Sequence, residues 1–418
     1  MHRVRMLLPF FKENGWEVQV LAVSPEQVAA PLDPWLLALL PADVVVHRVH
    51  PVGLKWSWIP GLGTLGLRAL RALARGGDRL LATSRFDLVY FSTTVFEVHL
   101  LGSHWKRKYG VPFVMDYQDP WVNGYYREHP QIEPPGGRLK YAVVDLIHKI
   151  MESAVLRQCA GITSVSPEYP KQLFQRYPWF RDTPHLVQPF PGAQQDFERL
   201  GDGPAGRRLF DPADGKLHWV YVGRGGPDMK VALRGFFMAL RDHLPKKLRR
   251  RLRVHFIGTS YAPSGTGKKS MAGIADEFGL GYLVEETPDR ISYEQALWSL
   301  KEADALIVPG SDDPAYTASK IYPYLLAGRP MLAIFHEEST VVDLIRKVGG
   351  AVSVSFTSNE PCEMLAERIA RDWLSGGQYA RTVALDERAF EPYTDRGSAV
   401  TLCQFLRQTV SDCRRLAE

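Results

Sequence analysis

Short apolar runs of strand type alternate with stretches of helical spacing along the whole chain. In the second half such runs lie at residues 217–222, 253–258, 282–285, 304–309, 331–335 and 351–355. In the first half they lie at 16–23, 44–49, 86–93, 112–116 and 160–166. Strands that alternate with helices need crossover connections, and these connections produce parallel sheets. The pattern therefore predicts an α/β fold.

The chain is too long for one ordinary hydrophobic core. It has 418 residues, so two domains are expected. Residues 201–215, GDGPAGRRLFDPADG, are rich in Gly, Pro and Asp and are typical of a linker. We predict an N-terminal domain over 1–205, a C-terminal domain over 206–389, and a terminal helical segment over 390–418 that packs back on the first domain.

Composition excludes several classes of protein. No apolar run reaches the roughly 18–20 residues of a membrane span, and no signal peptide is evident. The four cysteines are scattered without a CxxC pair, which argues against disulfides and structural zinc and favours a cytoplasmic protein. The net charge of +5 is mild, and no nucleic-acid motif accompanies the basic residues. We expect no nucleic-acid partner.

Two basic stretches each allow two interpretations. Residues 244–256, LPKKLRRRLRVHF, are either a solvated helix end or a surface that faces anionic lipid. Residues 65–81 form an amphipathic helix with Arg68, Arg71 and Arg75 on its polar side. This helix either packs within a domain or lies on a membrane. Peripheral contact with the inner membrane is thus one expected interaction.

The run WVYVGRGGPDMK at 219–230 has the form of a phosphate site. A buried strand breaks at Gly223 and leads into a helix, so unpaired N–H groups and the positive helix end meet at one place. Arg224 and Lys230 flank the turn. A lysine in the first helical turn is unfavourable without an anion. The pattern predicts an anion site, with a solvated turn as the alternative.

A second run, ASKIYPYLLAGRPML at 318–332, predicts another helix start. Ser319 is expected to cap the helix, with Lys320 pointing towards whatever lies in front of it. Gly328 and Pro330 end the helix. The preceding loop follows a predicted strand, and loops at the carboxyl ends of parallel strands bind ligands.

Two carboxylates follow a strand of the first domain. Asp116 and Asp119 in MDYQDPW either serve as a base or hold sugar hydroxyls. Asp119 precedes Pro120 and equally suits an ordinary turn. His99 and His104 are five residues apart and do not share a helix face well, which favours structural roles for both.

These motifs, in this order, resemble the GT-B fold glycosyltransferases of family 4. The second half carries VYVGRGGPDMK, HFIGTS, LKEADALIVPG and ASKIYPYLLAGRP. The first half carries RVRMLLPFFKENGWEVQVLAV, FDLVYFST, GVPFVMDYQDPW and GITSVSPEY. The resemblance covers nearly the whole chain. It implies two Rossmann-like domains facing a cleft, and sugar transfer from a nucleotide donor without a bound metal or cofactor.

The resemblance also implies roles for individual residues. Arg224 and Lys230 would hold the donor diphosphate. The implied donor and phosphate contacts are Gly223, Arg224, Gly225, Lys230, Tyr316, Thr317, Ser319 and Lys320. Further nucleotide or sugar contacts are Thr259, Asp312, Asp313, Glu337 and Glu338. The candidate catalytic residues are Asp116 and Asp119.

Two departures from the family pattern stand out. Pro323 occupies the position of an acidic residue that usually binds the donor ribose, so Asp312, Asp313 or Glu337 is expected to replace it. The chain begins inside the first helix, so the first strand of the N-terminal domain is expected to be missing.

The predicted function is transfer of a sugar from a nucleotide sugar to a polysaccharide, glycolipid or small-molecule acceptor. Bacterial cell-surface polysaccharide biosynthesis is the expected context, and UDP and GDP donors are both open. The alternatives are a nucleotide-sugar epimerase of the same fold and a catalytically silent binding protein. The expected location is the cytoplasm or the cytoplasmic face of the membrane.

Overall fold

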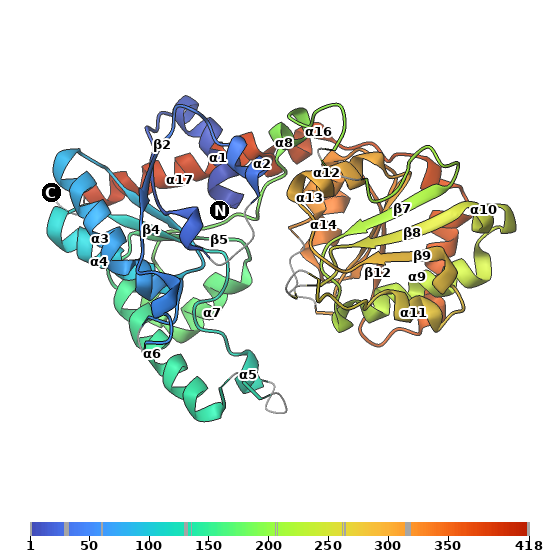
Figure 1. Cartoon of the computed structure of the whole chain (residues 1–418), viewed down its shortest axis with the longest axis horizontal. Coiled ribbons are helices and arrows are strands. Elements are labelled where there is room, and N and C mark those ends of the chain that lie inside the picture. The colour runs from blue at the N-terminus through green and yellow to red at the C-terminus, as the bar shows by residue number, and fades with distance from the viewer. Residues whose placement is uncertain are drawn as a thin grey trace. The chain divides into compact units, whose positions relative to one another are not determined.

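The computed structural model describes residues 2–28, 33–59, 62–128, 133–134, 136–204, 206, 208–260, 262, 265–313 and 319–415. The chain divides into two compact units, each built on parallel sheets, as Figure 1 shows. Unit 1 comprises Met1–Leu32, Leu39–Phe190 and Arg396–Glu418, and unit 2 comprises Asp33–Ala38 and Pro191–Asp395. The predicted α/β class with parallel sheets is confirmed.

Unit 1 contains a four-stranded parallel sheet in the order β3-β4-β5-β6 and a separate parallel pair, β1-β2. In the described part of the unit, α1 comes before the first strand. The strands are β1 (Gln19–Val23), β2 (Val45–Val49), β3 (Val89–Ser92), β4 (Phe113–Tyr117), β5 (Gly161–Ser164) and β6 (His185–Val187). The helices are α1 (His2–Phe11), α3 (Leu65–Thr83), α4 (Leu100–Tyr109), α5 (Tyr125–Glu128), α6 (Arg138–Leu156), α7 (Glu168–Arg176) and α17 (Asp395–Arg415).

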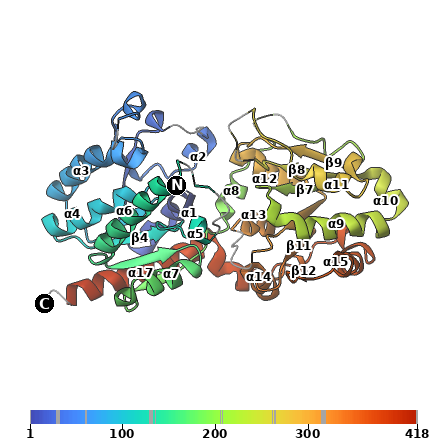
Figure 2. The same ribbon diagram turned by 90° about the horizontal axis from the view of Figure 1, so that it is seen from below.

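Strand β4 separates two layers of helices in unit 1. Its residues alternate between the two faces of the sheet. Phe113, Met115 and Tyr117 pack in a core with side chains of α3, α4, α6 and α7. Val114 packs on the other face, against α1 and α17. Figure 2 shows α3, α4 and α6 on one side of β4 and α17 on the other.

Helix α3 packs within unit 1. It contacts β1, β2 and α4, and its buried side includes Ala69 and Leu73. Arg68, predicted on the polar side, is buried, and its Nη1 donates a hydrogen bond of 2.8 Å to the carbonyl of Val52. Of the two interpretations of this amphipathic helix, the structure supports the packed one.

Unit 2 contains one six-stranded parallel sheet in the order β12-β11-β10-β7-β8-β9. Its strands are β7 (Leu217–Val222), β8 (Leu252–Ile257), β9 (Val284–Thr287), β10 (Ala305–Pro309), β11 (Met331–His336) and β12 (Val352–Phe356). Its helices are α2 (Pro34–Ala38), α8 (Gln194–Glu198), α9 (Lys230–His243), α10 (Lys246–Arg251), α11 (Ala272–Asp276), α12 (Tyr293–Glu302), α13 (Ile321–Leu326), α14 (Thr340–Val348), α15 (Cys362–Ile369) and α16 (Glu387–Phe390).

The predicted linker at 201–215 lies inside unit 2, and the units divide at 190/191. The Phe210 ring stacks on that of His218 at a centroid distance of 4.7 Å and lies tilted against that of His255 at 4.9 Å. The Asp214 carboxylate accepts a hydrogen bond from the backbone N–H of Lys216. These contacts make the segment a surface loop of unit 2. Gly, Pro and Asp indicate irregular structure, but do not indicate on which side of a domain boundary it lies.

Two buried histidines join β7 to β8 beneath this loop. His218 Nδ1 lies 2.9 Å from His255 Nε2, and His218 Nε2 lies 3.1 Å from the Asp214 carboxylate. Burial lowers the pKa of His255 to about 3, and the positive charge that His218 carries when protonated adds to this effect. Burial likewise lowers the pKa of His99 in unit 1 to about 4.

Mild acid is therefore expected to destabilise the protein. The unfolded chain binds protons at His99 and His255 near pH 6.5, whereas the folded chain binds them there only below about pH 4. The free energy of unfolding therefore falls as pH drops through 6.5. At pH 5 each of these two histidines contributes about 2 kcal/mol of this loss.

Urea unfolding at pH 7.5 and pH 5 measures this loss of stability. His255→Gln is expected to reduce the difference by about 2 kcal/mol, whereas His243→Gln, at the exposed end of α9, leaves it unchanged. Equal losses in all three proteins would contradict this assignment.

Candidate functional site

The strand order of unit 2 reverses next to β7. From β7 the chain continues to β8 and β9 on one side, then returns to β10 on the other side and continues to β11 and β12. Where the order reverses, the loops after the strands diverge and leave a crevice, which is where such sheets bind ligands. The loop 223–226 follows β7, and the loop that begins at Gly310 follows β10. Of the predicted phosphate residues, Gly223, Arg224 and Gly225 lie on the first of these loops, Ser319 and Lys320 lie immediately before α13, and Lys230 begins α9.

A tyrosine holds β7 and β10 apart at this point. The two strands pair only at Ala305 with Trp219 and at Leu306 with Val220. Beyond these pairs, the Tyr324 hydroxyl donates to the carbonyl of Val222 at 2.9 Å and accepts from its N–H at 2.6 Å. Tyr324 belongs to α13 and is buried. This contact anchors α13 at the opening and places Lys320, immediately before it, beside the end of β7.

Lys320 is a poorly solvated cation in this opening. Its Nζ donates a hydrogen bond of 2.6 Å to the Tyr221 hydroxyl and lies 4.8 Å from the centre of the tyrosine ring. Burial, and next the positive charge of Arg224, lower the pKa of Lys320 to about 7. Lys320 forms no ion pair with any residue of the described ranges. An anion bound here would stabilise its charged form.

Arg224 is held by a carboxylate of its own loop. Its Nη1 and Nη2 donate to the two oxygens of Asp228 at 2.9 and 2.7 Å. The guanidinium lowers the pKa of Asp228. The backbone carbonyl of Asp228 accepts from the N–H of Asp312, which ties the loop after β7 to the loop after β10. Arg224 is therefore fixed at the crevice before any ligand binds.

The glycines of the GRGG run make room for these charged groups. A Cβ at Gly223 would lie 2.5 Å from Lys320 Nζ. A Cβ at Gly226 would lie 2.3 Å from an Asp228 oxygen and 2.7 Å from Arg224 Nη1. The ion pair thus folds over the backbone of Gly226, and the ammonium group over Gly223. A side chain at either glycine would require Lys320, Arg224 or Asp228 to shift.

The other predicted donor residues are less closely associated with Lys320. Lys230 begins α9, is about half exposed, and has its Nζ 3.9 Å from Glu277 of α11. Gly225 packs against Ser270 and donates its N–H to the carbonyl of Thr259. Ser319 does not cap α13, because the N-cap position is Lys320 and has no side-chain cap. Tyr316 and Thr317 lie outside the described residues.

Thr259 has a partner inside unit 2. Its hydroxyl donates to Glu286 at 2.6 Å, and Glu286 also accepts from the backbone N–H groups of Ser270, Met271 and Ala272. This carboxylate fixes the start of α11. The structure therefore gives Thr259 a positioning role beside the crevice.

The remaining acidic candidates lie at the same edge of the sheet. Asp312 and Asp313 are exposed on the loop after β10, and Glu337 and Glu338 are exposed after β11. Partial burial, and next the nearby Asp228 charge, raise the pKa of Asp312. Asp312, Asp313 and Glu337 are the residues that we expect to replace an acidic residue at position 323, where this chain has proline.

In unit 1, Asp116 forms a fully buried ion pair with Arg3. Arg3 Nε lies 2.9 Å from Asp116 Oδ2, and neither side chain is exposed. The carboxylate also accepts hydrogen bonds from the side chains of Ser92, Gln118 and Thr163 at 3.0, 2.7 and 2.8 Å. A carboxylate with these partners and no solvent access does not reach a substrate. The structure therefore gives Asp116 a structural role in place of the predicted catalytic one.

Asp119 differs from Asp116 in its surroundings. It follows the carboxyl end of β4 and is exposed. Partial burial raises its pKa, and its charge contributes to a raised pKa of Tyr169. His99, by contrast, is buried, with its ring 5.5 Å from that of Phe91 and 5.6 Å from that of Trp121. Of Asp116, Asp119 and His99, Asp119 is the residue with an exposed side chain.

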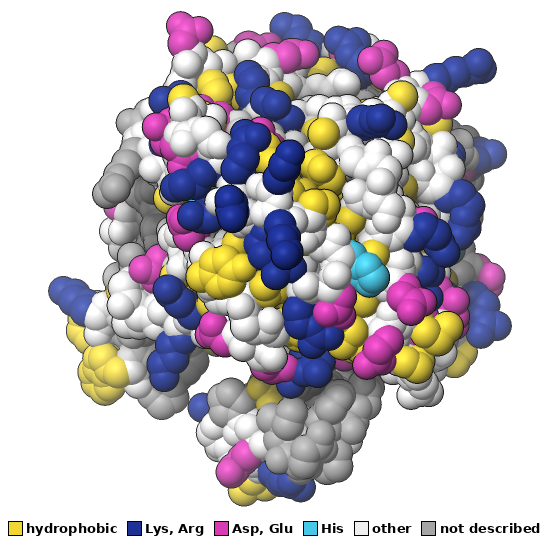
Figure 3. Space-filling view, turned by 90° about the vertical axis from the view of Figure 1, so that its right-hand side faces the viewer, with side chains coloured by type: hydrophobic (Ala, Val, Ile, Leu, Met, Phe, Trp, Pro, Cys, Tyr) yellow, Lys and Arg dark blue, Asp and Glu magenta, His cyan; other side chains and the backbone are white. Residues whose placement is uncertain are grey.

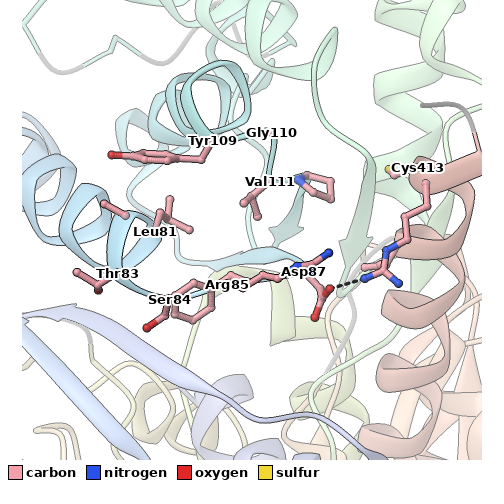
Figure 4. A pocket seen from close by; sticks show the side chains of 14 residues that line it. Leu81, Thr83, Ser84, Arg85, Asp87, Tyr109, Gly110, Val111 and Cys413 are labelled. Atoms are coloured by element: carbon pink, nitrogen blue, oxygen red, sulfur yellow. Dashed lines mark hydrogen bonds and ion pairs between the residues drawn. The ribbon is translucent and has the colours of Figure 1, made fainter. Parts of the chain in front are cut away.

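Two further features of the surface lie apart from these residues. A cavity of about 640 Å³ in unit 1 lies near the ends of α3 and α4. Figure 4 shows its lining, in which Asp87 pairs with Arg414. Figure 3 shows Lys and Arg gathered on the side of unit 2 that carries α10. Arg249 of α10 donates to two carbonyls at the end of α9, as expected for a helix end.

The described residues also set limits on other ligands. They include no group of three or more His, Cys, Asp and Glu side chains that could hold a metal ion. No helix within these ranges is long and apolar enough to cross a membrane.

Comparison with known structures assigns the fold to GT-B. The Anabaena Alr3699/HepE structure with UDP and glucose has a TM-score of 0.55 and 13% identity, over 95% of this chain and 100% of that chain. The α,α-trehalose 6-phosphate synthase of Burkholderia multivorans has a TM-score of 0.55 and 13% identity, over 99% and 92%. The N-terminal domain of Candida albicans trehalose-6-phosphate phosphatase has a TM-score of 0.57 and 12% identity, over 97% and 92%.

A family model matches the N-terminal part of the sequence. Residues 2–191 match the glycosyl transferase 4-like domain. No curated protein sequence gives a significant match. This match covers fewer than half of the 418 residues. Like the fold, it agrees with the resemblance to GT-B glycosyltransferases of the family-4 type found in the motifs.

Proposed function

We propose that this protein transfers a hexosyl group from a UDP-sugar to a glycan or lipid-linked acceptor. We further propose that it needs no metal and works in bacterial cell-surface polysaccharide biosynthesis, at the cytoplasmic face of the membrane. The single observation that carries the donor site is Lys320 beside Arg224 at the strand reversal of unit 2, where Lys320 is poorly solvated and forms no ion pair with any described residue. UDP is proposed as the nucleotide because it is the one named with Alr3699/HepE.

The proposed chemistry depends on charge that develops on the leaving group. When the glycosidic bond to the diphosphate breaks, negative charge accumulates on the phosphate oxygens. Lys320 and Arg224 are already positioned by Tyr221 and Asp228, so little reorganisation is needed as the charge forms. Fixed donors of this kind contribute about 3 kcal/mol each to transition-state stabilisation. Lys230 would add a longer-range charge from the first turn of α9.

The acceptor side of the reaction is proposed to use Asp119. Its raised pKa and its place at the carboxyl end of β4 suit a group that binds or deprotonates a sugar hydroxyl. On the donor side, Asp312, Asp313 or Glu337 would bind the ribose in place of a carboxylate at position 323. The proton released by the acceptor hydroxyl would pass to Asp119 or to the leaving diphosphate.

A thermal-shift panel followed by a turnover assay tests the proposal. UDP is expected to raise the melting temperature more than GDP, ADP or TDP, because a ligand of the folded state stabilises it. UDP release from a UDP-sugar is then expected to require an added acceptor. If the protein interconverts UDP-sugars without an acceptor, the result would favour an epimerase. If it binds UDP without any turnover, the result would favour a silent binding protein. No shift with any nucleotide would contradict the donor site itself.

A further inference from the structure

Helix α6 presents a row of apolar side chains to solvent. Leu139, Val143, Leu146, Ile147 and Ile150 are spaced so that they share one face of the helix. Their exposed fractions are 82%, 51%, 58%, 47% and 61%. Single exposed apolar residues are common on protein surfaces, but a contiguous row marks a site of interaction. We call these five residues the α6 stripe.

The α6 stripe lies opposite the side that holds the helix to unit 1. Glu152, Val155 and Leu156 are buried, and Glu152 pairs with Arg176 of α7 at 2.8 Å. At 100° per residue, these three residues lie roughly half a turn away from the stripe. The helix is therefore anchored by one face and free on the other, and no residue of the described ranges covers the five side chains.

The charges beside the α6 stripe are positive. By helical geometry Lys140 lies along one border of the stripe. Lys149 lies beyond the other border, and its ammonium group pairs with Asp145 at 2.7 Å. The carboxylates of the helix lie on the far half, where Asp145 pairs with Arg127 and Lys149 and Glu152 is buried. A second copy of the helix would bring lysines next to lysines, which disfavours self-association. An anionic surface complements this arrangement.

We propose that α6 docks unit 1 on an anionic lipid surface. The α6 stripe would enter the boundary between headgroups and acyl chains, and the nearby lysines would contact lipid phosphates. The sequence pattern left lipid contact as one of two interpretations for residues 65–81 and 244–256, and this assignment places it on a different helix. Helix α3 uses its apolar side inside unit 1, whereas α6 keeps an apolar side free. The proposal does not depend on the identity of the sugar donor.

Vesicle sedimentation tests this proposal on the full chain. We expect binding to phosphatidylcholine vesicles that contain phosphatidylglycerol, little binding to phosphatidylcholine alone, and weaker binding as salt rises from about 0.1 M to about 1 M. The double variant Leu146→Glu with Ile150→Glu is expected to bind at least about tenfold more weakly, because two apolar anchors are lost. Lys140→Glu is expected to weaken binding to the anionic vesicles.

Matched variants keep the test specific. Met364→Glu alters an equally exposed apolar residue on α15 of unit 2 and is expected to bind like the wild type. Circular dichroism shows whether each variant is folded.

Absence of vesicle binding by the wild type, or equal binding by the double variant, would overturn the proposal. Loss of binding in Lys246→Glu with Lys247→Glu but not in the double variant would assign the lipid surface to α10. Self-association that the double variant abolishes, without vesicle binding, would make a second copy the occupant.

Discussion

Replacing Lys320 with alanine is expected to lower the turnover of the UDP-sugar at least about a hundredfold while unit 2 stays folded. Removal of one preorganised donor from a site where charge develops typically has an effect of this size. The fold is expected to persist because Lys320 is poorly solvated and forms no ion pair with any described residue, so its loss leaves no carboxylate unpaired. A turnover assay with the UDP-sugar measures the loss of activity, and calorimetric titration with UDP measures binding of the nucleotide.

The pH dependence of UDP binding separates charge from shape at this position. Because the pKa of Lys320 is lowered to about 7, the side chain is charged below that pH and loses its proton above it. Affinity for UDP is therefore expected to fall between pH 6 and pH 9 in the wild type, and to fall much less in Lys320→Arg, which stays charged. Lys246→Ala on α10 serves as the control. Unchanged UDP affinity in both Lys320→Ala and Arg224→Ala would eliminate the proposed phosphate site.

The largest expected change in stability comes from Arg3→Ala. Its loss leaves the Asp116 carboxylate buried without its cation, and breaking a buried pair in this way costs about 3–5 kcal/mol. Arg3 also donates to the side chain and the carbonyl of Gln188, at 3.2 and 2.6 Å, so two further hydrogen bonds are lost. Urea unfolding of unit 1 measures the change.

An exposed ion pair next to the same helix provides the comparison. Lys12 lies 3.5 Å from Asp43 with both side chains largely exposed, so Lys12→Ala is expected to change stability by less than about 1 kcal/mol. Replacing both charges, as Arg3→Met with Asp116→Asn, is expected to recover part of the loss because no unpaired charge remains. A loss in Arg3→Ala no larger than that in Lys12→Ala would show that Asp116 is not held as described.

The grouping of the proposed donor-site residues at one edge of the sheet could be predicted from sequence because its signals are local. The glycines at 223 and 225 follow a strand pattern directly, and the lysine at 320 precedes a helical pattern after the next-but-two strand of the same domain. The carboxyl ends of parallel strands must share one edge of the sheet. Asp228, the partner of Arg224, lies four residues away in the same run, but its role depends on the fold of the loop. Tyr324 had no sequence signal, because a helical tyrosine normally fills a core.

The role of Asp116 could not be predicted from its own surroundings in the sequence. Its partner, Arg3, belongs to the first helix, and only the packing of α1 on β4 brings the two together. The α6 stripe illustrates a second limit. Apolar residues at helical spacing look the same whether a neighbouring element covers them or solvent does. The side on which α6 is anchored is decided by Glu152 and Arg176, which belong to different helices.

The Tyr324 hydroxyl has a consequence for how the donor crevice is maintained. A single phenolic oxygen replaces the hydrogen bonds that a neighbouring strand would otherwise provide to Val222. Between β7 and β10 the pairing is thus interrupted by a side chain. Both backbone groups of Val222 that face β10 already have the Tyr324 hydroxyl as a hydrogen-bond partner. The opening is therefore present in the protein without a ligand, and a nucleotide that binds there as proposed would not have to separate two strands in order to enter.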